Sequence, residues 1–351
     1  MRVVLAAAAV VTAGALAGAL VLALRTPQAA RAGRAAASAP AHATTRSPSG
    51  STGGPARPVA GRAATRYSFS TLDNPADATF NQLLGVSNLG HIAGYSGSGA
   101  AGHPYRGYIL RPPYRQARYQ AISVPGSVQT QLTGLNNTGI QVGFWSAQNK
   151  ASQVESNVGF YLRAGRFASV RFPTRDNASP PVNQLLGVND HGIAVGFYTD
   201  GQGRHHGYRY DIATRTFAIV AVPGGSSVIA AAINNSGGVA GFFTGRNGVT
   251  SGFFLRATGQ LFILNAPHAA MTQALGVSDS GEVVGGYRLG SGSRAATHGF
   301  TWTPQRGFTT VDDPRGVGTT TIDGVNDAGD LVGFYVDGPG NTDGLLATPG
   351  R

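Results

Sequence analysis

Cysteine is absent from the 351 residues of this chain, which excludes disulfides, thiol catalysis and cysteine-ligated metal sites. Glutamate is nearly absent as well, and Glu155 and Glu282 are its two occurrences. An enzyme that cleaves glycosidic bonds with a pair of carboxylates would therefore need two aspartates, and no such pair is marked out by its spacing. A phosphate-binding glycine loop, a nucleophile elbow and a calcium loop with a closing glutamate are also missing. The sequence points to no particular reaction, and we expect neither a cofactor nor a metal ion.

Long hydrophobic runs are missing too, except at the N-terminus, where residues 3–24 are uncharged and apolar between two arginines. This run fits the core of a secretory signal, and small-residue cleavage sites follow it. It is also long enough to span a bilayer. We therefore expect residues 1–32 to be a signal peptide or a membrane anchor. If it is not cleaved, this run would be the protein's only contact with a membrane.

Residues 33–66 are rich in Ala, Ser, Pro and Arg and contain no acidic residue. Such a composition cannot bury enough surface to fold, so we expect a disordered linker. Residues 1–66 hold eight arginines, which supply most of the net charge of +11. The sequence pI of about 10.4 would suggest nucleic acid, but the charge lies mainly in this N-terminal part. No nucleic-acid partner is expected.

The remainder, residues 67–351, is organised by a repeated phrase that is clearest at residues 324–335, with the sequence GVNDAGDLVGFY. Five further copies begin at Gly85, Gly134, Gly187, Ala232 and Gly276. Successive copies are 44 to 53 residues apart. A repeat of this length is typical of proteins built from stacked or radially arranged units.

Each copy predicts a β-hairpin whose turn reads Asn or Ser, then Asn or Asp, then any residue, and then Gly. Asn and Asp side chains bond nearby backbone amides, and glycine enters the left-handed region at low cost, which suits a type I turn with a glycine bulge. The turn glycines are Gly90, Gly139, Gly192, Gly237, Gly281 and Gly329. A second glycine lies in the middle of the following strand, for example Gly333, where it indicates a bulge or a close approach of neighbouring sheets.

A second phrase follows each copy and begins with a glycine and an aromatic residue or leucine. In the first five units it continues through a turn into a β-branched or aromatic run that ends in proline. This predicts four strands per unit, which at this period is typical of a propeller blade. The sixth unit lacks its fourth strand, and residues 67–75 form a strand-and-proline segment with no repeat before it. We therefore expect an all-β, six-bladed propeller closed by this N-terminal strand, and an open six-unit solenoid is the alternative.

The two phrases together resemble the HAF-type extracellular repeat family of bacterial proteins, in which a GxN(N/D)xGxxVG element alternates with a His-Ala/Gly-Phe element. The resemblance covers all six units. The histidine of the second element is present at His206 and His298, and other residues replace it elsewhere. The resemblance implies an exported protein built from β repeats, and it brings no catalytic residues.

Binding residues should break the repeat, because the positions that form the sheets recur while functional positions need not. The links between the second and third strands vary most, and variable loops on a rigid scaffold are where binding normally occurs. Together with the links from the fourth strand to the next unit, they should share one face, where we expect a ligand-binding site. The candidate residues are Trp145, Tyr198, Asp200, His205, His206, Tyr287, Arg288, His298, Tyr335 and Asp337.

Some of these candidates also have a purely structural interpretation. Asp200 and Asp337 precede a glycine at matching places in two units, where aspartate commonly caps a turn. His205 and His206 are adjacent on an expected strand, so their side chains should point to opposite faces and should not share one metal ion.

From these features we expect an exported, non-catalytic and monomeric binding protein at the bacterial cell envelope or in the extracellular space, with a glycan or a protein as its ligand. An extracellular hydrolase or lyase acting on a polysaccharide at the loop-rich face is one alternative. A structural surface protein is the other. An enzyme should gather aspartate, histidine, arginine and tyrosine side chains in one place, whereas a binding protein needs an aromatic and polar rim.

Overall fold

The computed structural model describes residues 66–100, 102–115, 118–147, 156–290, 292 and 295–350. The expected signal or anchor (1–32) and the expected linker (33–66), apart from Arg66, lie outside these residues. The described chain contains 24 strands. Within it, no helix is long and apolar enough to cross a membrane.

The strands form six units of four, numbered here in chain order. Unit one comprises β2 (Asn81–Val86), β3 (Ile92–Ser96), β4 (Arg106–Leu110) and β5 (Tyr119–Ile122). Unit two comprises β6 (Gln129–Leu135), β7 (Gln141–Ala147), β8 (Ser156–Arg163) and β9 (Arg166–Val170). Unit three comprises β10 (Asn183–Val188), β11 (Ile193–Thr199), β12 (His205–Asp211) and β13 (Thr216–Ile219).

The second half of the chain repeats this plan. Unit four comprises β14 (Gly225–Ile233), β15 (Val239–Gly245), β16 (Thr250–Leu255) and β17 (Leu261–Leu264). Unit five comprises β18 (Met271–Val277), β19 (Val283–Arg288), β20 (Thr297–Thr303) and β21 (Gly307–Thr310). Unit six comprises β22 (Thr320–Val325), β23 (Leu331–Val336) and β24 (Thr342–Pro349), together with β1 (Tyr67–Thr71).

Unit six takes its outer strand from the other end of the chain. β1 pairs antiparallel with β24, from Tyr67 opposite Pro349 to Thr71 opposite Leu345. Residues 67–71 therefore supply the strand that the last repeat lacks, although the strand ends before Pro75. In the other units each strand pairs antiparallel with the next one along the chain.

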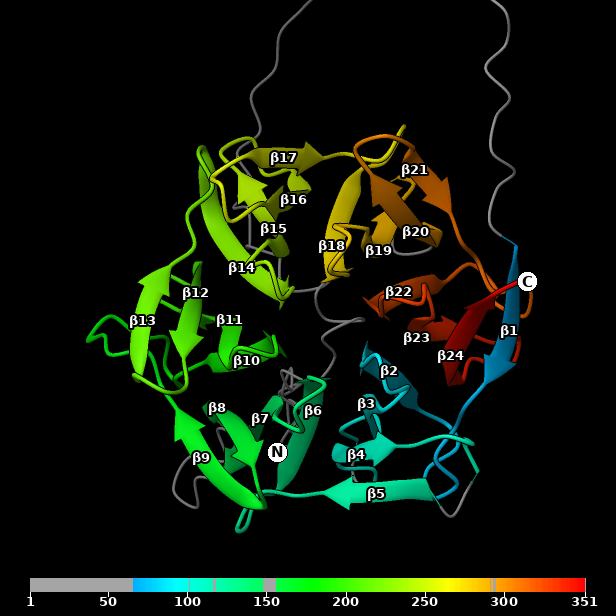
Figure 1. Ribbon diagram of the computed structural model, residues 1–351, viewed down its shortest axis with the longest axis horizontal. Coiled ribbons are helices and arrows are strands. Elements are labelled where there is room, and N and C mark those ends of the chain that lie inside the picture. The colour runs from blue at the N-terminus through cyan, green and yellow to red at the C-terminus, as the bar shows by residue number, and fades with distance from the viewer. Residues whose placement is uncertain are drawn as a thin grey trace, which may run out of the picture. The chain divides into compact units, whose positions relative to one another are not determined.

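The units surround a common centre, with β2, β6, β10, β14, β18 and β22 innermost (Figure 1). Each innermost strand contacts that of the next unit, and β22 contacts β2. The innermost strands lie so close together that almost no room is left for a side chain, since a Cβ on Gly324 would lie 3.0 Å from the Cα of Gly85. The first glycine of the repeated phrase is therefore set by packing between units.

The second glycine of the phrase faces a bulge within its own unit. In every unit the pairing of the two inner strands skips one residue of the first strand. In unit six, Gly333 lies opposite Ile322 beside this bulge. A Cβ on Gly333 would lie 1.9 Å from the carbonyl oxygen of Thr321, so no larger residue fits without a backbone shift. The expected association of this glycine with a bulge is confirmed.

The tight turns also connect the units, which the sequence did not predict. At each of the six junctions a backbone N–H donates to the side-chain oxygen of the equivalent residue in the next unit, at 2.7 to 2.9 Å. We call these six residues the turn ring; they are Asn88, Asn137, Asp190, Asn235, Asp279 and Asp327. The last contact, from Asp327 to Asn88, joins unit six to unit one. The turn glycines have positive φ angles, as predicted.

The hydrophobic core is distributed over the junctions. Six clusters of buried residues each combine side chains from two adjacent units. The cluster between units six and one, for example, joins Leu83 and Tyr108 to Val332 and Leu346. Each unit therefore buries its apolar faces only against its neighbours. The described chain has an all-β, propeller-like fold of repeated sheets.

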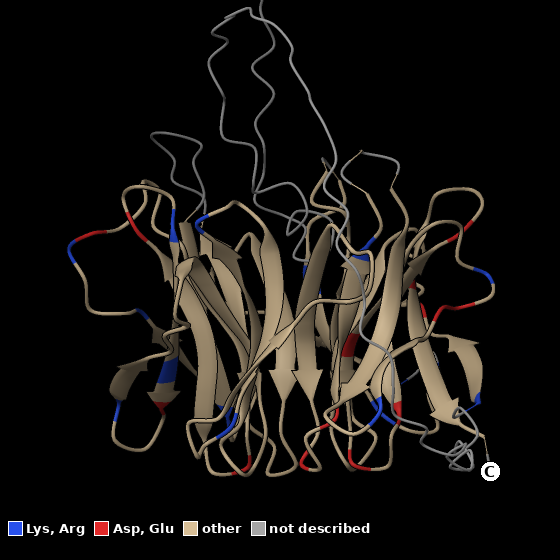
Figure 2. Ribbon diagram, turned by 90° about the horizontal axis from the view of Figure 1, so that it is seen from above, with Lys and Arg blue, Asp and Glu red and all other residues tan. Residues whose placement is uncertain are grey.

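The two ends of the units differ in their connections (Figure 2). One end, the turn end, carries the six short turns between first and second strands. The other end, the loop end, carries the links between second and third strands and those between consecutive units. The links between second and third strands differ in length from unit to unit, from residues 246–249 in unit four to residues 97–105 in unit one.

Candidate ligand-binding site

The loop end contains a pocket at the junction of units three and four. In the described chain, five of the six junctions carry a parallel backbone pairing at this level, for example Arg106 with Thr130. The junction of units three and four has none, and the N–H of His205 donates instead to the hydroxyl of Ser227 (2.9 Å). β14 also has an additional bulge between Gly225 and Ser227. The pocket is lined by residues 204–207, 219–222, 225, 226 and 228.

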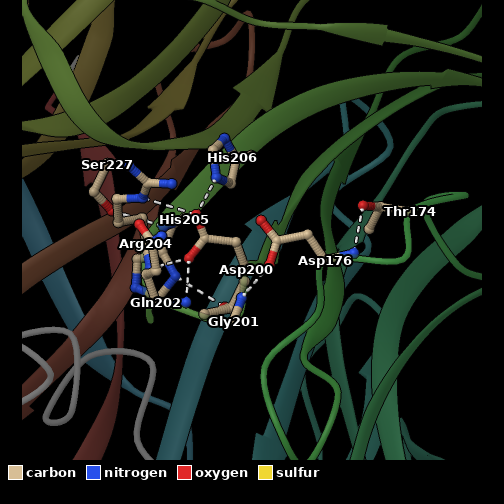
Figure 3. A network of polar contacts seen from close by, with 10 residues as sticks. Thr174, Asp176, Asp200, Gly201, Gln202, Arg204, His205, His206 and Ser227 are labelled. Carbon is tan, nitrogen blue, oxygen red and sulfur yellow. Dashed lines mark hydrogen bonds and ion pairs between the residues drawn. The ribbon is translucent and has the colours of Figure 1, made fainter.

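Asp200 organises the link that leads into this pocket (Figure 3). It is 1 % exposed. Its Oδ1 accepts the N–H groups of Gln202 and Arg204, both at 2.9 Å. Its Oδ2 accepts Nε of Arg204 and Nε2 of His206, both at 2.8 Å.

These contacts determine the charge of Asp200. Burial alone would raise its pKa, but the hydrogen bonds from His206, Arg204 and Gln202 outweigh burial and hold the pKa well below the ordinary value of 3.8. Asp200 is therefore an anion that fixes the guanidinium of Arg204 at the edge of the pocket and the imidazole of His206 on the face of β12 toward unit two. The expected turn-capping role is confirmed, and the contacts to two side chains add to it.

His206 is held on its second side by aromatic packing. Its ring stacks on Tyr198, with centroids 4.8 Å apart and planes at 17°. Tyr198 stacks in turn on Phe172, which precedes unit three, with centroids 4.5 Å apart. Because Nε2 of His206 donates to Asp200, its Nδ1 is the acceptor in the neutral ring. The imidazole is thus held in a rigid stack on the face of β12 that is turned toward unit two, away from the pocket.

His205 points to the opposite face of β12, as predicted. Its ring packs edge-on against Phe197, with centroids 4.9 Å apart, and Nδ1 lies 3.0 Å from the Thr199 hydroxyl. Burial, followed by the charge of His206, lowers the pKa of His205 to about 4. His205 is therefore neutral near pH 7.

The pocket offers positive charge beside an apolar wall. Arg204 is the cation, and 49 % of its side chain is exposed although Nε is bound to Asp200. In the part of the chain that the structure describes, no acidic side chain lines the pocket. Ile219, which is 54 % exposed, stands among the lining residues. A ligand that carries a carboxylate or another anionic group next to an apolar surface would suit this lining.

Two residues of the site were not predicted from the sequence. Asp176, in the link from unit two to unit three, accepts the N–H of Gly201 at 2.9 Å and so connects the two links (Figure 3). Ser227 replaces the backbone pairing of the other junctions. Neither residue stands in a motif, because each acts across a junction on a residue that is distant in the sequence.

Three of the remaining candidates lie together in unit five. The ring of His298 stacks on Tyr287 with centroids 5.3 Å apart, and its Nδ1 lies 2.7 Å from Oδ2 of Asp312. The neighbouring Arg288 has a buried Nε with no hydrogen-bond partner among the described residues. Unit five thus repeats the stacked Tyr–His pair of unit three, but the acid comes from the link after its fourth strand.

The last three candidates lie apart from both Tyr–His pairs. Tyr335 is 3 % exposed, and its hydroxyl lies 2.8 Å from that of Thr71 on β1, so it packs in the seam of unit six. Asp337 accepts the N–H groups of Gly340 and Asn341, which is a turn cap as expected. Trp145 packs against the cluster between units one and two. The structure therefore separates the predicted residues into several places, one of which is the pocket beside Asp200.

Metal-ligating groups are not concentrated anywhere in the described residues, since no three His, Asp or Glu side chains lie close enough to hold a metal ion together. His205 and His206 point apart, in agreement with the sequence argument.

Comparisons with known proteins identify no family, since no protein-family model and no curated protein matches the chain. Among solved structures, TolB of Acinetobacter baumannii is similar over 74 % of this chain at 12 % identity and a TM-score of 0.43, and this chain covers 64 % of TolB. AofleA of Arthrobotrys oligospora is similar over 82 % of this chain and 87 % of its own, at 11 % identity and a TM-score of 0.49. The SapL1 lectin, solved with α-methyl fucoside, is similar over 75 % of this chain and 90 % of its own, at 10 % identity and a TM-score of 0.48. Similarity this low indicates no function for this chain.

Proposed function

We propose that residues 67–351 form a closed six-bladed β-propeller of the HAF-type repeat family, carried behind a signal peptide or anchor (1–32) and a linker (33–66). The pairing of β1 with β24 and the contact of β22 with β2 support closure. The uncharged run at residues 3–24 supports export to the bacterial cell envelope or the extracellular space.

The function that fits this molecule best is non-catalytic binding of an acidic glycan at the pocket between units three and four. The observation that carries this proposal is the pocket lining: a half-exposed Arg204, whose Nε is fixed by Asp200, beside an exposed Ile219. An arginine whose Nε is already bound keeps its terminal nitrogens for a second carboxylate. The apolar wall suits the non-polar face of a sugar ring.

Hydrolysis of a polysaccharide is less well supported. Asp200 already accepts four hydrogen bonds and has a lowered pKa, so it is unsuited to donating a proton. The lining residues supply no second carboxylate. The pocket can therefore hold and orient a ligand, but it has no acid–base pair of the kind that glycosidases use.

The binding proposal is tested with two matched variants of the purified protein. Arg204→Gln removes the cation of the pocket, and Arg246→Gln removes an exposed arginine from the corresponding link of unit four. Oligosaccharides of uronic acids and uncharged oligosaccharides are the probes in calorimetric titrations. We expect the wild type and Arg246→Gln to bind the acidic probe, and Arg204→Gln to bind it about tenfold more weakly or worse, since a charged hydrogen bond contributes about 1.5–3 kcal/mol.

Either of two results would contradict it: equal affinity of both variants, or equal affinity of the wild type for acidic and uncharged probes. Export is tested separately by fractionating expressing cells and measuring the intact mass of the product. A soluble extracellular chain that starts near residue 33 indicates a cleaved signal, and a full-length chain in the membrane fraction indicates an anchor. A full-length chain in the cytoplasm would contradict export.

A further inference from the structure

The centre of the described chain contains a cavity that is lined by the innermost strands of all six units. At the level of the bulges, each unit contributes the residue that the strand pairing skips. Five of these residues are Leu84, Thr133, Leu186, Ala231 and Leu275. The sixth is Asp323, so one carboxyl group stands where three other units place leucine.

Asp323 is buried without a complete set of partners. It is 8 % exposed, and its Oδ2 has no hydrogen bond in the described chain. Thr133, the other polar side chain at this level, already donates to backbone carbonyl groups of Val142 and Leu185. Burying a carboxyl group without a partner is costly, and native proteins rarely leave one so without a function.

The cavity opens toward the turn end through a mouth that carries acidic side chains. The two share a collar of apolar residues, Val86, Leu135, Val188, Ile233, Val277 and Val325. The turn ring lines the mouth and contains three acids, Asp190, Asp279 and Asp327. Among the described residues, no lysine, arginine or histidine lines either part. A narrow entrance lined by one sign of charge concentrates ions of the opposite sign.

We propose that this central cavity binds a small, oxygen-liganded metal cation of the calcium class, with Asp323 as its charged ligand and the three acids of the turn ring at its entrance. Carboxylate, carbonyl and water oxygens suit hard cations such as Ca²⁺. Backbone groups of the bulged residues and water would complete the shell, so the site needs no cluster of acidic side chains. With one carboxylate, the affinity falls in the weak range, with a Kd of about 0.1–1 mM.

Burial raises the pKa of Asp323 well above its ordinary value, so a cation has to displace this proton when it binds the carboxylate.

The test uses the full chain and two substitutions at Asp323. Asp323→Leu gives unit six the leucine that three other units have at the equivalent position (Leu84, Leu186 and Leu275), so the variant should fold. Asp323→Asn keeps the shape and removes the charge. Calcium chloride is titrated while the melting temperature and the heat of binding are recorded, with sodium chloride at matched ionic strength as the control.

We expect saturable binding of one Ca²⁺ by the wild type and a loss of at least tenfold in affinity in both variants. Asp279→Asn at the mouth should weaken binding by only about two- to threefold, because it changes the attraction of the ion and not its ligands. The proposal is overturned if Asp323→Leu responds to calcium as the wild type does, if sodium chloride reproduces the response, or if the wild type shows no saturable binding. If Asp323 has only a structural role, Asp323→Leu should be more stable than the wild type, and calcium should affect neither the wild type nor the variants.

Discussion

The turn end and the loop end are built from the same six units but follow different rules. At the turn end all six junctions are alike in one respect, because each carries a hydrogen bond from a backbone N–H to a side chain of the turn ring. At the loop end the junction between units three and four lacks the backbone pairing of the others and carries the pocket. Regular positions therefore hold the units together, and a departure from the repeat creates a place for a ligand.

The largest effect is expected where the repeat is strictest. Gly333→Ala would place a Cβ 1.9 Å from the carbonyl oxygen of Thr321, so the inner strands of unit six must separate. We expect a loss of about 3 kcal/mol in the free energy of unfolding, measured by urea denaturation. Gly338→Ala is the matched control, since a Cβ there meets nothing within 4 Å and should leave stability unchanged. Equal stability of the two variants would show that the bulge tolerates a side chain.

A second prediction compares two aspartates that occupy matching places at the loop end. Asp200→Ala removes a turn cap and leaves Arg204 and His206 without their carboxylate, so we expect a loss of about 2 kcal/mol. Asp337→Ala removes mainly a turn cap, and we expect about 1 kcal/mol. Denaturant titrations of both variants measure the difference. If Asp337→Ala is the more damaging, Asp200 has no special position in the fold.

A third prediction separates the two ends by their response to pH. The pKa of His205 falls from 6.5 in the unfolded chain to about 4 in the folded one, so protonation favours unfolding. Its contribution to stability is complete above pH 6.5 and is lost as pH falls toward 4. In the turn ring, burial would raise the pKa of Asp190, but hydrogen bonds from Asn137 lower it, so that contribution is lost only below about 3.8.

Melting temperatures between pH 7 and pH 5 test this difference. We expect His205→Gln to lose less stability over this interval than the wild type, and Asp190→Asn to follow the wild type. Asp73, whose pKa burial raises to about 6, acts in the opposite direction, because its ionisation destabilises the fold as pH rises. A wild type and a His205→Gln variant with parallel pH profiles would contradict the assignment.

The smallest effect is expected within the turn ring. The amide of Asn235 donates to carboxylates on both sides, at 2.9 Å to Asp190 and 2.8 Å to Asp279. Asn235→Asp replaces this donor by a third carboxylate, so we expect a loss of about 1 kcal/mol that salt reduces. Asn247→Asp, at an exposed turn of the loop end, is the control and should be neutral. An equal response of both variants to salt would show that the ring does not concentrate charge.

The sequence predicted the regular part of this molecule with useful detail. The six units, their four strands, the turn glycines and a strand within residues 67–75 all follow from patterns that repeat. It also placed Asp200, His205 and His206 among the candidates, because they interrupt the repeat. It could not distinguish them from Tyr335, which is buried beside β1 in unit six. In the sequence, Tyr335 and Tyr198 occupy the same place in the repeated phrase.

The sequence by itself determined the local architecture, because strand alternation and turn chemistry depend on neighbouring residues. Only the tertiary structure decided which junction lacks the parallel backbone pairing, that Asp176 reaches Gly201, and that Asp323 faces a central cavity. Those features depend on how units distant in sequence meet. A one-residue bulge determines on which face of the sheet a side chain lies. The local sequence does not show which part of another unit that side chain will then face.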